Sequence, residues 1–208
     1  MKQLLTEYTP FQYDIDQVNE SINKNNGRLI VKGLLQRGDS KNQNERVYPM
    51  PILEREVTRY MDNEVKQRRA LGELDHPESS VVNLKNVSHN ILATEWKGND
   101  LFGTIEILNT PAGNILKELF KSGITLGISS RGMGSVKQLD ESTTEVQSDF
   151  QLVCWDFVSN PSTQGAYMTP MTVNESKVTF TPVDYLNEAH ELLRDIICEL
   201  SNTCCLKW

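Results

Sequence analysis

The chain has 208 residues, and its 21 basic and 28 acidic residues give a formal net charge of −7. This length allows one large domain with an appendage or two small domains. No apolar run approaches the roughly 18 residues that span a bilayer, and the first residues lack the apolar core of a secretory signal. We therefore expect no membrane partner and no export. We also expect no nucleic acid partner, because binding phosphates requires a basic surface.

The chain has four cysteines and three histidines. The cysteines lack the paired spacing of a zinc site, so we interpret them as reduced thiols. A multi-histidine metal centre would have to recruit carboxylates from distant parts of the chain. The sequence therefore predicts no metal and no cofactor, and it leaves few candidates for acid and base chemistry near neutral pH.

The first half of the chain alternates between polar segments and predicted elements. Residues 1–27 are polar and end in Asn-Asn-Gly, a turn signal, after which residues 28–35 read as a strand. A polar loop then leads to apolar residues at helical spacing, which predict a surface helix over 51–67. Two β-rich runs, 90–96 and 101–108, are joined by Lys-Gly-Asn-Asp, a connection typical of a hairpin.

The second half continues the mixture of helix and strand. Residues 110–123 begin with Thr-Pro and end with Gly, the residues that favour the start and the end of a helix. Three strands are predicted over 126–132, 134–139 and 150–158, with a turn at 140–142 between the last two. The sequence therefore predicts an α+β domain dominated by antiparallel pairing.

The composition changes beyond residue 170. Apolar residues at helical spacing predict an amphipathic helix over 183–200, which either docks on the body or serves as a partner surface or detachable tail. We therefore divide the chain into a main domain, residues 1–172, and a linker with a C-terminal helix and tail, residues 173–208.

Two segments combine glycines with reactive side chains. The first, residues 70–77, ends in His-Pro, and the proline favours extended backbone at His76. The second, residues 126–134, contains Ser129 and Ser130, and successive residues of a strand face opposite sides, so only one of them can face a given site. Alone, each segment also has a bland explanation: a histidine at a sheet rim, or hydroxyls bonded to the local backbone.

Together the two segments supply the groups of nucleophilic catalysis, because a serine hydroxyl is unreactive until an imidazole accepts its proton. Asp156, a lone carboxylate among apolar residues, is our candidate for orienting the imidazole. Asp75 is a weaker candidate, because neighbouring side chains of an extended chain diverge. The order His76, Ser129, Asp156 differs from that of chymotrypsin-like, subtilisin-like and α/β-hydrolase enzymes. It indicates another fold.

The sequence resembles the prohead core proteases of tailed bacteriophages, serine peptidases that clear the internal scaffold and trim capsid proteins during head maturation. The resemblance spans about residues 27–171 and rests on four blocks in order, residues 46–49, 70–77, 96–100 and 127–135. It implies that His76 is the catalytic histidine and Ser129 the nucleophile. The position near Asp156 corresponds to the third member of the site. Residues 1–172 then form the protease domain.

The family is similar in fold to herpesvirus assemblin, so the resemblance implies an α+β fold that is mainly an antiparallel β-barrel flanked by helices. In such a site the oxyanion needs preorganised donors. We assign this role to backbone amides near Arg131 and Gly132, with the Arg131 guanidinium as electrostatic support. The alternative for Arg131 is a surface ion pair.

The resemblance also implies cleavage after glutamate in Leu/Ile-x-Glu contexts. Leu-Asn-Glu at 186–188 fits this pattern, so Glu188 is a candidate site of self-processing, although such tripeptides are frequent in an acidic sequence. The implied partners are phage scaffold or core proteins and capsid proteins as substrates, and further copies of the same chain in a homo-oligomer. The implied location is the host cytoplasm, inside the assembling prohead.

Two other functions compete with this interpretation. A non-enzymatic phage assembly or scaffold protein could share the barrel fold, because a fold does not fix a function. A thiol hydrolase built on Cys154 is disfavoured, because its neighbours Val153 and Trp155 supply no charge that would stabilise a thiolate.

Overall fold

The structure is a computed structural model that describes residues 15–171. The predicted helix at 183–200, Glu188 and the tail from residue 173 lie outside the described residues. None of the helices between residues 15 and 171 has the length and apolar character of a membrane span.

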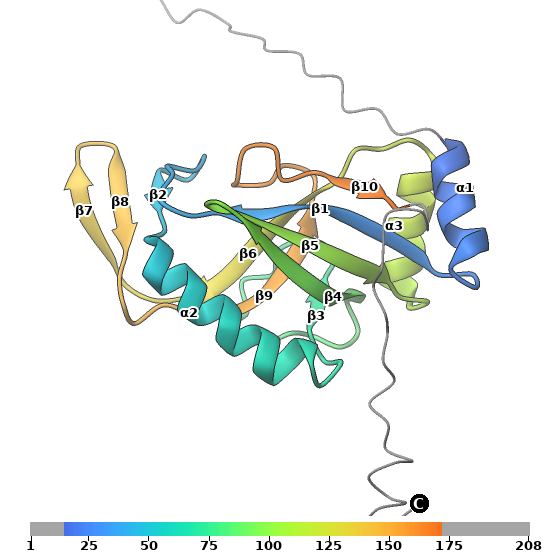
Figure 1. The fold of residues 1–208 in the computed structure, drawn as a ribbon, viewed down its shortest axis with the longest axis horizontal. Helices are drawn as coiled ribbons and strands as arrows, with labels where there is room; N and C mark the ends of the chain where they lie inside the picture. Colours follow the sequence, from blue (N-terminus) through green and yellow to red (C-terminus); the bar gives the residue numbers. More distant parts are fainter. Residues whose placement is uncertain (1–14, 172–208) are drawn as a thin grey trace, which may run out of the picture. The chain divides into compact units, whose positions relative to one another are not determined.

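The largest sheet has five strands, each antiparallel to its neighbours. In chain order they are β1 (Leu29–Arg37), β3 (Leu71–Glu73), β4 (Val87–Lys97), β5 (Asp100–Ile107) and β10 (Met168–Pro170). Their order across the sheet is β10-β1-β5-β4-β3 (Figure 1). The predicted first strand and the predicted hairpin are confirmed as β1 and β4–β5. Gly98 in the hairpin turn has φ +60, a left-handed conformation that favours glycine.

The remaining strands form two smaller sheets. The first pairs β6 (Gly127–Met133) with β9 (Gln151–Val158) in antiparallel fashion. The second contains β2 (Arg46–Val47), β8 (Thr143–Val146) and β7 (Val136–Asp140), in that order. The turn predicted between the second and third of the late strands instead joins β7 to β8. The sequence missed β8 because this short strand has no apolar run.

The predicted β-barrel is not closed. Between the five-stranded sheet and the β6–β9 sheet the backbone forms only single bridges, one from Leu74 to Phe157 and one from Gly127 to Tyr167. Among the described residues the structure is therefore a mixture of helices with separate, mainly antiparallel sheets. The predicted α+β class and antiparallel pairing are confirmed. The prediction of a closed barrel is wrong, and the likeness to herpesvirus assemblin stays a prediction.

Side chains explain why the backbone ladder is interrupted between β3 and β9. Nε2 of His89, on β4, bonds to the carbonyl of Trp155 at 2.9 Å. The backbone amide of Glu73 donates to Oδ1 of Asp156 at 2.9 Å. At these positions side-chain groups satisfy the backbone groups that a closed barrel would pair with a neighbouring strand.

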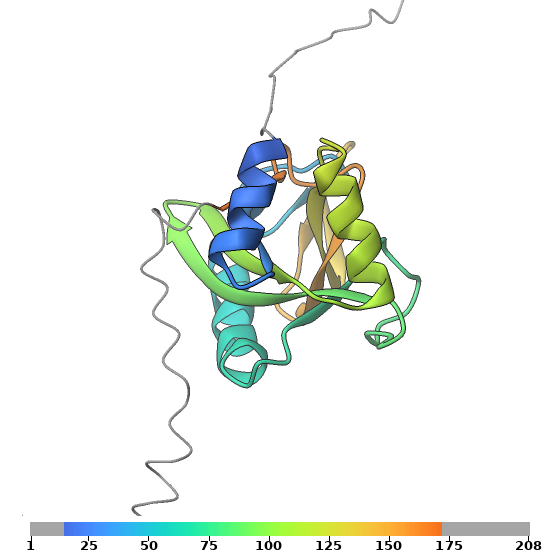
Figure 2. The same ribbon diagram turned by 90° about the vertical axis from the view of Figure 1, so that its right-hand side faces the viewer.

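In the part of the chain that the structure describes, three α-helices cover the sheets. They are α1 (Ile15–Lys24), α2 (Met50–Tyr60), which continues as a π-helical turn η1 (Met61–Val65), and α3 (Pro111–Lys121). Figures 1 and 2 show α1 beside α3 at one end, and α2 lies against β9. The helices predicted over 51–67 and 110–123 are confirmed, and the side chain of Thr110 caps α3 by accepting from the Gly113 amide at 3.0 Å. The sequence missed α1.

Aromatic side chains fix β9 in the core. Trp155 and Phe157 are fully buried. Trp155 packs edge-on against Tyr60 of α2 with ring centroids 5.0 Å apart, and Phe157 packs against Phe120 of α3 at 5.9 Å. Each such pair adds about 1 kcal/mol to the burial of its rings. Because side chains alternate along a strand, this packing directs Asp156, the residue between them, to the other side of β9.

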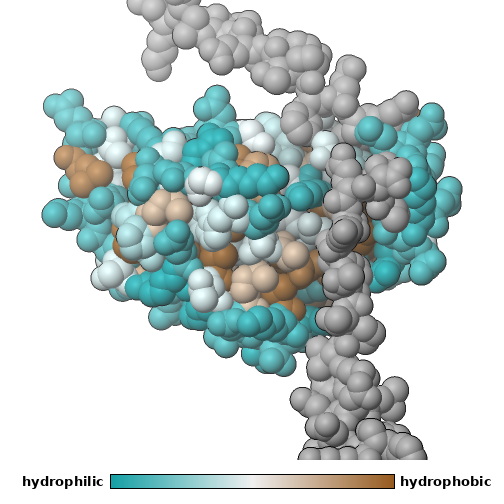
Figure 3. Space-filling view, viewed as in Figure 1, coloured by the Kyte–Doolittle hydropathy of each residue, from teal (hydrophilic) through white to brown (hydrophobic). Residues whose placement is uncertain are grey.

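The face of the molecule seen in Figure 1 is largely polar. Figure 3 shows mainly hydrophilic residues on the face seen in Figure 1, as the net charge of −7 leads one to expect. Apolar exceptions include Val136 and Leu139, two half-exposed residues of β7.

Candidate active site

The β6–β9 pair brings two of the predicted site residues together. Ser129 on β6 and Asp156 on β9 are register partners, and both are buried. His76 comes from the segment after β3, where Asp75 adopts a left-handed conformation with φ +69 and turns the chain. The structure thus gathers His76, Ser129 and Asp156 from three separate elements.

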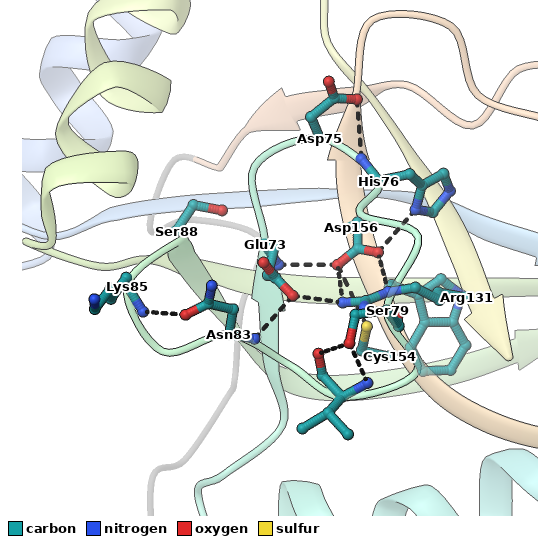
Figure 4. Close-up of polar contacts among 12 residues, drawn as sticks. Glu73, Asp75, His76, Ser79, Asn83, Lys85, Ser88, Arg131, Cys154 and Asp156 are labelled. Atoms are coloured by element: carbon teal, nitrogen blue, oxygen red, sulfur yellow. Dashed lines mark hydrogen bonds and ion pairs between the residues drawn. The ribbon is translucent and has the colours of Figure 1, made fainter.

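The ring of His76 is held by Asp156. Nδ1 of His76 lies 2.8 Å from Oδ2 of Asp156 (Figure 4). The His76 side chain is 37% exposed, whereas that of Asp156 is fully buried. Asp75 instead accepts a hydrogen bond from the backbone amide of His76 at 2.9 Å. Of the two carboxylates considered for orienting the imidazole, the ring therefore contacts Asp156.

Asp156 is ionised at neutral pH. Burial by itself raises the pKa of Asp156, but hydrogen bonds from His76, Arg131 and the amide of Glu73 outweigh burial and hold this pKa below its ordinary value. An ionised carboxylate can only accept hydrogen bonds, so the proton in this contact sits on Nδ1 of His76. Nε2 is then the nitrogen with a free lone pair.

Arg131 is part of a buried ion network. Its Nε donates to Oδ2 of Asp156 at 2.8 Å, its Nη2 to Oε1 of Glu73 at 2.9 Å, and its Nη1 to the carbonyl of Ser79 at 2.5 Å. Burial lowers the pKa of Arg131, but bonds with Asp156 and Glu73 outweigh it and raise this pKa. The guanidinium is thus a permanent cation directed at Asp156, and the alternative of a surface ion pair is wrong.

Ser129 lies on the wall of an open pocket of about 530 Å³. The wall also contains His76, Gly132 and Ser162. Oγ of Ser129 is hydrogen-bonded to Oγ of Ser162 at 3.0 Å. Among residues 15–171 no hydrogen bond joins Ser129 to His76, although the hydroxyl and the ring line the same pocket.

The alternation of side chains along β6 does not by itself decide which of the two serines lines the pocket. Ser130 also lines the pocket, contrary to the expectation that only one of the pair would reach it. Register separates them instead, because Ser129 lies opposite Asp156 whereas Ser130 lies opposite Trp155.

Three members of the site were not singled out from the sequence. Glu73 holds Arg131, Ser79 accepts from it through its backbone carbonyl, and Ser162 contacts Ser129. Glu73 lies inside the block 70–77, where a carboxylate between Gly72 and Leu74, three positions before His76, was an available signal. Ser162 and Ser79 carried no local signal.

The thiol of Cys154 contacts the same network. Its Sγ lies 3.3 Å from Oδ1 of Asp156. Burial and the neighbouring Asp156 raise the pKa of Cys154, so the thiol stays protonated and is a poor nucleophile. Between residues 15 and 171, no three His, Cys, Asp or Glu side chains are grouped to hold a metal ion.

Comparison with known proteins gives the class of this chain. A family described as prohead core protein serine protease matches residues 16–178. The match covers most of the chain, and the chain therefore belongs to this family of serine proteases. The resemblance drawn from the sequence blocks is confirmed.

A sequence match and a structure match to bacteriophage T4 give the detail of this similarity. The chain is 34% identical over 152 residues to the prohead core protein protease of Enterobacteria phage T4, an alignment that covers 72% of each chain. The structure is also similar to that of the bacteriophage T4 capsid assembly protease, gp21, with a TM-score of 0.60 and 32% identity. This likeness covers 62% of the present chain and 80% of that one.

Proposed function

We propose that the chain is a serine endopeptidase that cleaves phage scaffold and capsid proteins after glutamate, inside the assembling prohead in the host cytoplasm. Ser129 is the nucleophile, His76 moves the proton and Asp156 orients the ring. The observation that carries this proposal is the bond between Nδ1 of His76 and Asp156 on the pocket that holds Ser129. Membership of the prohead protease family supports the substrate class.

Acylation begins when the Ser129 hydroxyl gives up its hydrogen bond to Ser162 and donates one to Nε2 of His76 instead. Because Asp156 keeps the other ring proton on Nδ1, Nε2 is free to accept the hydroxyl proton. As the proton moves, Oγ forms a bond to the scissile carbonyl carbon, and the carbonyl oxygen becomes an oxyanion. Asp156 stabilises the imidazolium that results.

The intermediate then collapses and breaks the peptide C–N bond. The proton on Nε2 goes to the leaving amine, which departs and leaves an acyl ester on Ser129. Water attacks this ester and gives a proton to Nε2. The second collapse returns that proton to Oγ of Ser129 and releases the new carboxyl terminus.

Backbone amides at Arg131 and Gly132 are the proposed donors to the oxyanion. Both residues line the pocket, and the β6–β9 register shifts between them. Such irregularities free backbone groups from the ladder and redirect them. The Arg131 guanidinium acts on the site through Asp156, to which its donors are directed.

Arg46 supports the proposed preference for glutamate. This exposed residue of β2 lines the same pocket, and no side-chain hydrogen bond or ion pair among residues 15–171 engages its guanidinium. The guanidinium of Arg131 is already bound to Asp156 and Glu73. Arg46 is therefore the arginine in the wall that can pair with a substrate carboxylate.

Substitution of the paired serines tests the nucleophile. Ser129→Ala should lower kcat on a scaffold-like peptide containing Leu-x-Glu by about 10³-fold or more, and Ser130→Ala by less than about tenfold. Both variants should keep the melting temperature of the parent. Full activity of Ser129→Ala would reject the assignment. A fluorophosphonate probe that labels Ser129 indicates a hydrolase, and absence of labelling at several pH values indicates the non-enzymatic assembly protein.

Substrate variants test the role of Arg46. Replacing the glutamate before the cleaved bond by glutamine should lower kcat/KM by roughly 10 to 100-fold, because the pair with Arg46 is lost. In Arg46→Gln the two peptides should be cleaved at similar rates. A preference that survives in Arg46→Gln would assign glutamate recognition to other groups.

Self-processing and self-association are the remaining parts of the proposal. Mass spectrometry should find chains ending at Glu188 in the active protein, and intact chains in Ser129→Ala and Glu188→Gln. Light scattering should give the mass of a homo-oligomer. Ends at other residues, or the mass of one chain, would contradict these two parts while leaving the peptidase assignment in place.

A further inference from the structure

We propose that Glu73 is a positioning residue that makes the His76–Asp156 pair a better proton acceptor by countering the charge of Arg131. This inference rests on the proposed function, because it concerns the group that takes the Ser129 proton. It starts from a feature that a simple Ser-His-Asp site lacks. The carboxylate that orients the imidazole is also bound by a buried arginine (Figure 4).

Arg131 alone would weaken Asp156. Its Nε and Nη2 both reach the carboxylate, at 2.8 Å and 3.2 Å, so one positive charge neutralises one negative charge at the back of the ring. The orienting carboxylate works by stabilising the imidazolium. A carboxylate already paired with a cation has less attraction left for a second one.

Glu73 restores the missing negative charge. Its Oε1 accepts from Nη2 of Arg131 at 2.9 Å, the same nitrogen that contacts Asp156. With a neutral ring, Glu73, Arg131 and Asp156 carry a net charge of −1. When His76 takes a proton, the four groups together become neutral. Without the charge of Glu73, the same step would take the group from neutral to +1, which is unfavourable because Arg131 and Asp156 are buried away from water.

The burial of Glu73 indicates that its charge, beyond its hydrogen bonds, is the feature that matters. The residue is fully buried. Oε1 also accepts from the Asn83 amide at 3.0 Å, whereas Oε2 accepts no hydrogen bond from any described residue. A glutamine oxygen could accept both bonds without the penalty of burying a charge. The extra property of glutamate here is the negative charge beside Arg131.

Other charged groups near the ring do not replace Glu73. Asp75 is next in sequence and is exposed, with its carboxylate on the backbone amide of His76. Arg46 is exposed and lines the open pocket, where solvent screens its charge. Cys154 on β9 contacts Asp156 but stays protonated, since burial raises its pKa. The charge balance behind the ring therefore depends on Glu73, Arg131 and Asp156.

The test is a pH titration of the His76 ring by NMR, which needs no catalysis. The chain has only three histidines, so labelled imidazole signals can be assigned by substitution. In Glu73→Gln the midpoint of the His76 titration should move to lower pH by about one unit, a tenfold loss of proton affinity. In Glu73→Asp, which keeps the charge, most of this shift should disappear.

A matched control separates the effect of removing the charge of Glu73 from the effect of removing any buried carboxylate. Glu56 is also buried and bound to arginines, Arg55 and Arg59, but it forms no hydrogen bond or ion pair with Arg131 or Asp156. Glu56→Gln should leave the His76 midpoint within about 0.2 units of the parent, where only long-range screened charge acts. An equal shift in both variants would overturn the inference.

A double substitution tests charge balance directly. Arg131→Gln removes the cation and should move the His76 midpoint to higher pH. The pair Glu73→Gln with Arg131→Gln leaves Asp156 as the one charge and should return the midpoint towards that of the parent. A merely structural role would make the double variant at least as perturbed as either single one. If Glu73→Gln does not fold, the comparison of Arg131→Gln with the double variant still carries the test.

The outcomes distinguish this inference from the proposed function. A Ser129→Ala variant that stays active rejects the function and leaves the titration meaningful. An inactive Ser129→Ala with an unshifted midpoint in Glu73→Gln rejects the role of Glu73 alone. If the proposed function and the role of Glu73 are both correct, the midpoint of the rise of kcat/KM with pH should shift in Glu73→Gln by the same amount as the NMR midpoint of His76.

Discussion

Two buried carboxylates anchor opposite ends of β9, and they are built differently. At the start of the strand, Glu56 of α2 accepts from Arg55 at 3.0 Å, from Arg59 at 2.9 Å and from the backbone amide of Leu152 at 3.0 Å. Near its end, Asp156 shares a single arginine with Glu73 and contacts a histidine.

The difference is in the balance of charge. Glu56 is paired with two arginines, both partly in water, so its charge is more than compensated. Neither arginine changes its charge near neutral pH. Asp156 and Glu73 divide one arginine, so a negative charge remains beside an imidazole that faces a pocket. The same residue types therefore give a clamp between α2 and β9 in one place and the proposed proton-accepting site in the other.

The largest expected effect comes from converting each acid to its amide. Asp156→Asn should lower kcat about 10³-fold or more, because an amide can hold the imidazole in the wrong tautomer and no longer stabilises the imidazolium. Glu56→Gln should leave kcat within about threefold, because it orients no reacting group. Steady-state kinetics on one peptide substrate measures both. Similar losses in the two variants would erase the functional contrast between the ends of β9.

His89 offers a second contrast along the same strand, through stability. It is fully buried, and its Nε2 bonds to the carbonyl of Trp155, next to Asp156. A carbonyl only accepts, so Nε2 carries the proton and Nδ1 accepts from Ser88 at 2.8 Å. Burial lowers the pKa of His89 to about 4, against hydrogen bonding to Trp155 and the charge of Asp156.

This shift sets a pH window for acid destabilisation. As pH falls below 6.5, the ordinary value for histidine, the unfolded chain takes up a proton that folded His89 refuses until about pH 4. The free energy of unfolding should therefore drop by about 3 kcal/mol between pH 6.5 and pH 4. The stabilisation from Asp156 and Glu56 begins to fall only below their ordinary carboxyl pKa values of 3.8 and 4.5, so it overlaps the acid end of this window alone.

Urea unfolding at several pH values measures the drop, and His89→Gln is the matched variant because its amide can still donate to Trp155. In that variant the slope between pH 6.5 and pH 4 should largely vanish. A slope that persists unchanged would assign the acid sensitivity to other groups.

Local patterns predicted the elements that carry their own signals. The Thr110 cap and the closing Gly123 marked α3, and the Gly98 connection marked the β4–β5 hairpin. By contrast, α1 lies in a polar segment, and only Val18 and Ser21 of the helix are buried. Its place is set by contacts with α3 and β1, which a short and narrow apolar stripe does not reveal.

The site shows the same division between local and distant information. His76, Ser129 and Asp156 could be singled out as candidates because each residue type suits the chemistry. Glu73 was not, because its importance depends on Arg131, 58 positions further along the chain. Closure of the barrel was wrongly predicted for a related reason. Side chains such as that of His89 interrupt the ladder, and no local pattern shows where they reach.

The smallest expected effect is on the clamp itself. Glu56→Gln should lower the free energy of unfolding by about 1 to 2 kcal/mol, less than a fully buried ion pair, because Arg55 and Arg59 remain partly solvated. Hydrogen bonding, led by the Leu152 amide, outweighs burial and lowers the pKa of Glu56. Its stabilisation is therefore present above the ordinary carboxyl pKa and lost as pH falls through the lowered value. Urea unfolding at pH 7 and near pH 3 should show the two proteins converging at the lower pH. A constant difference would mean that Glu56 acts through packing, and the contrast in charge between the two ends of β9 would then rest on Asp156 alone.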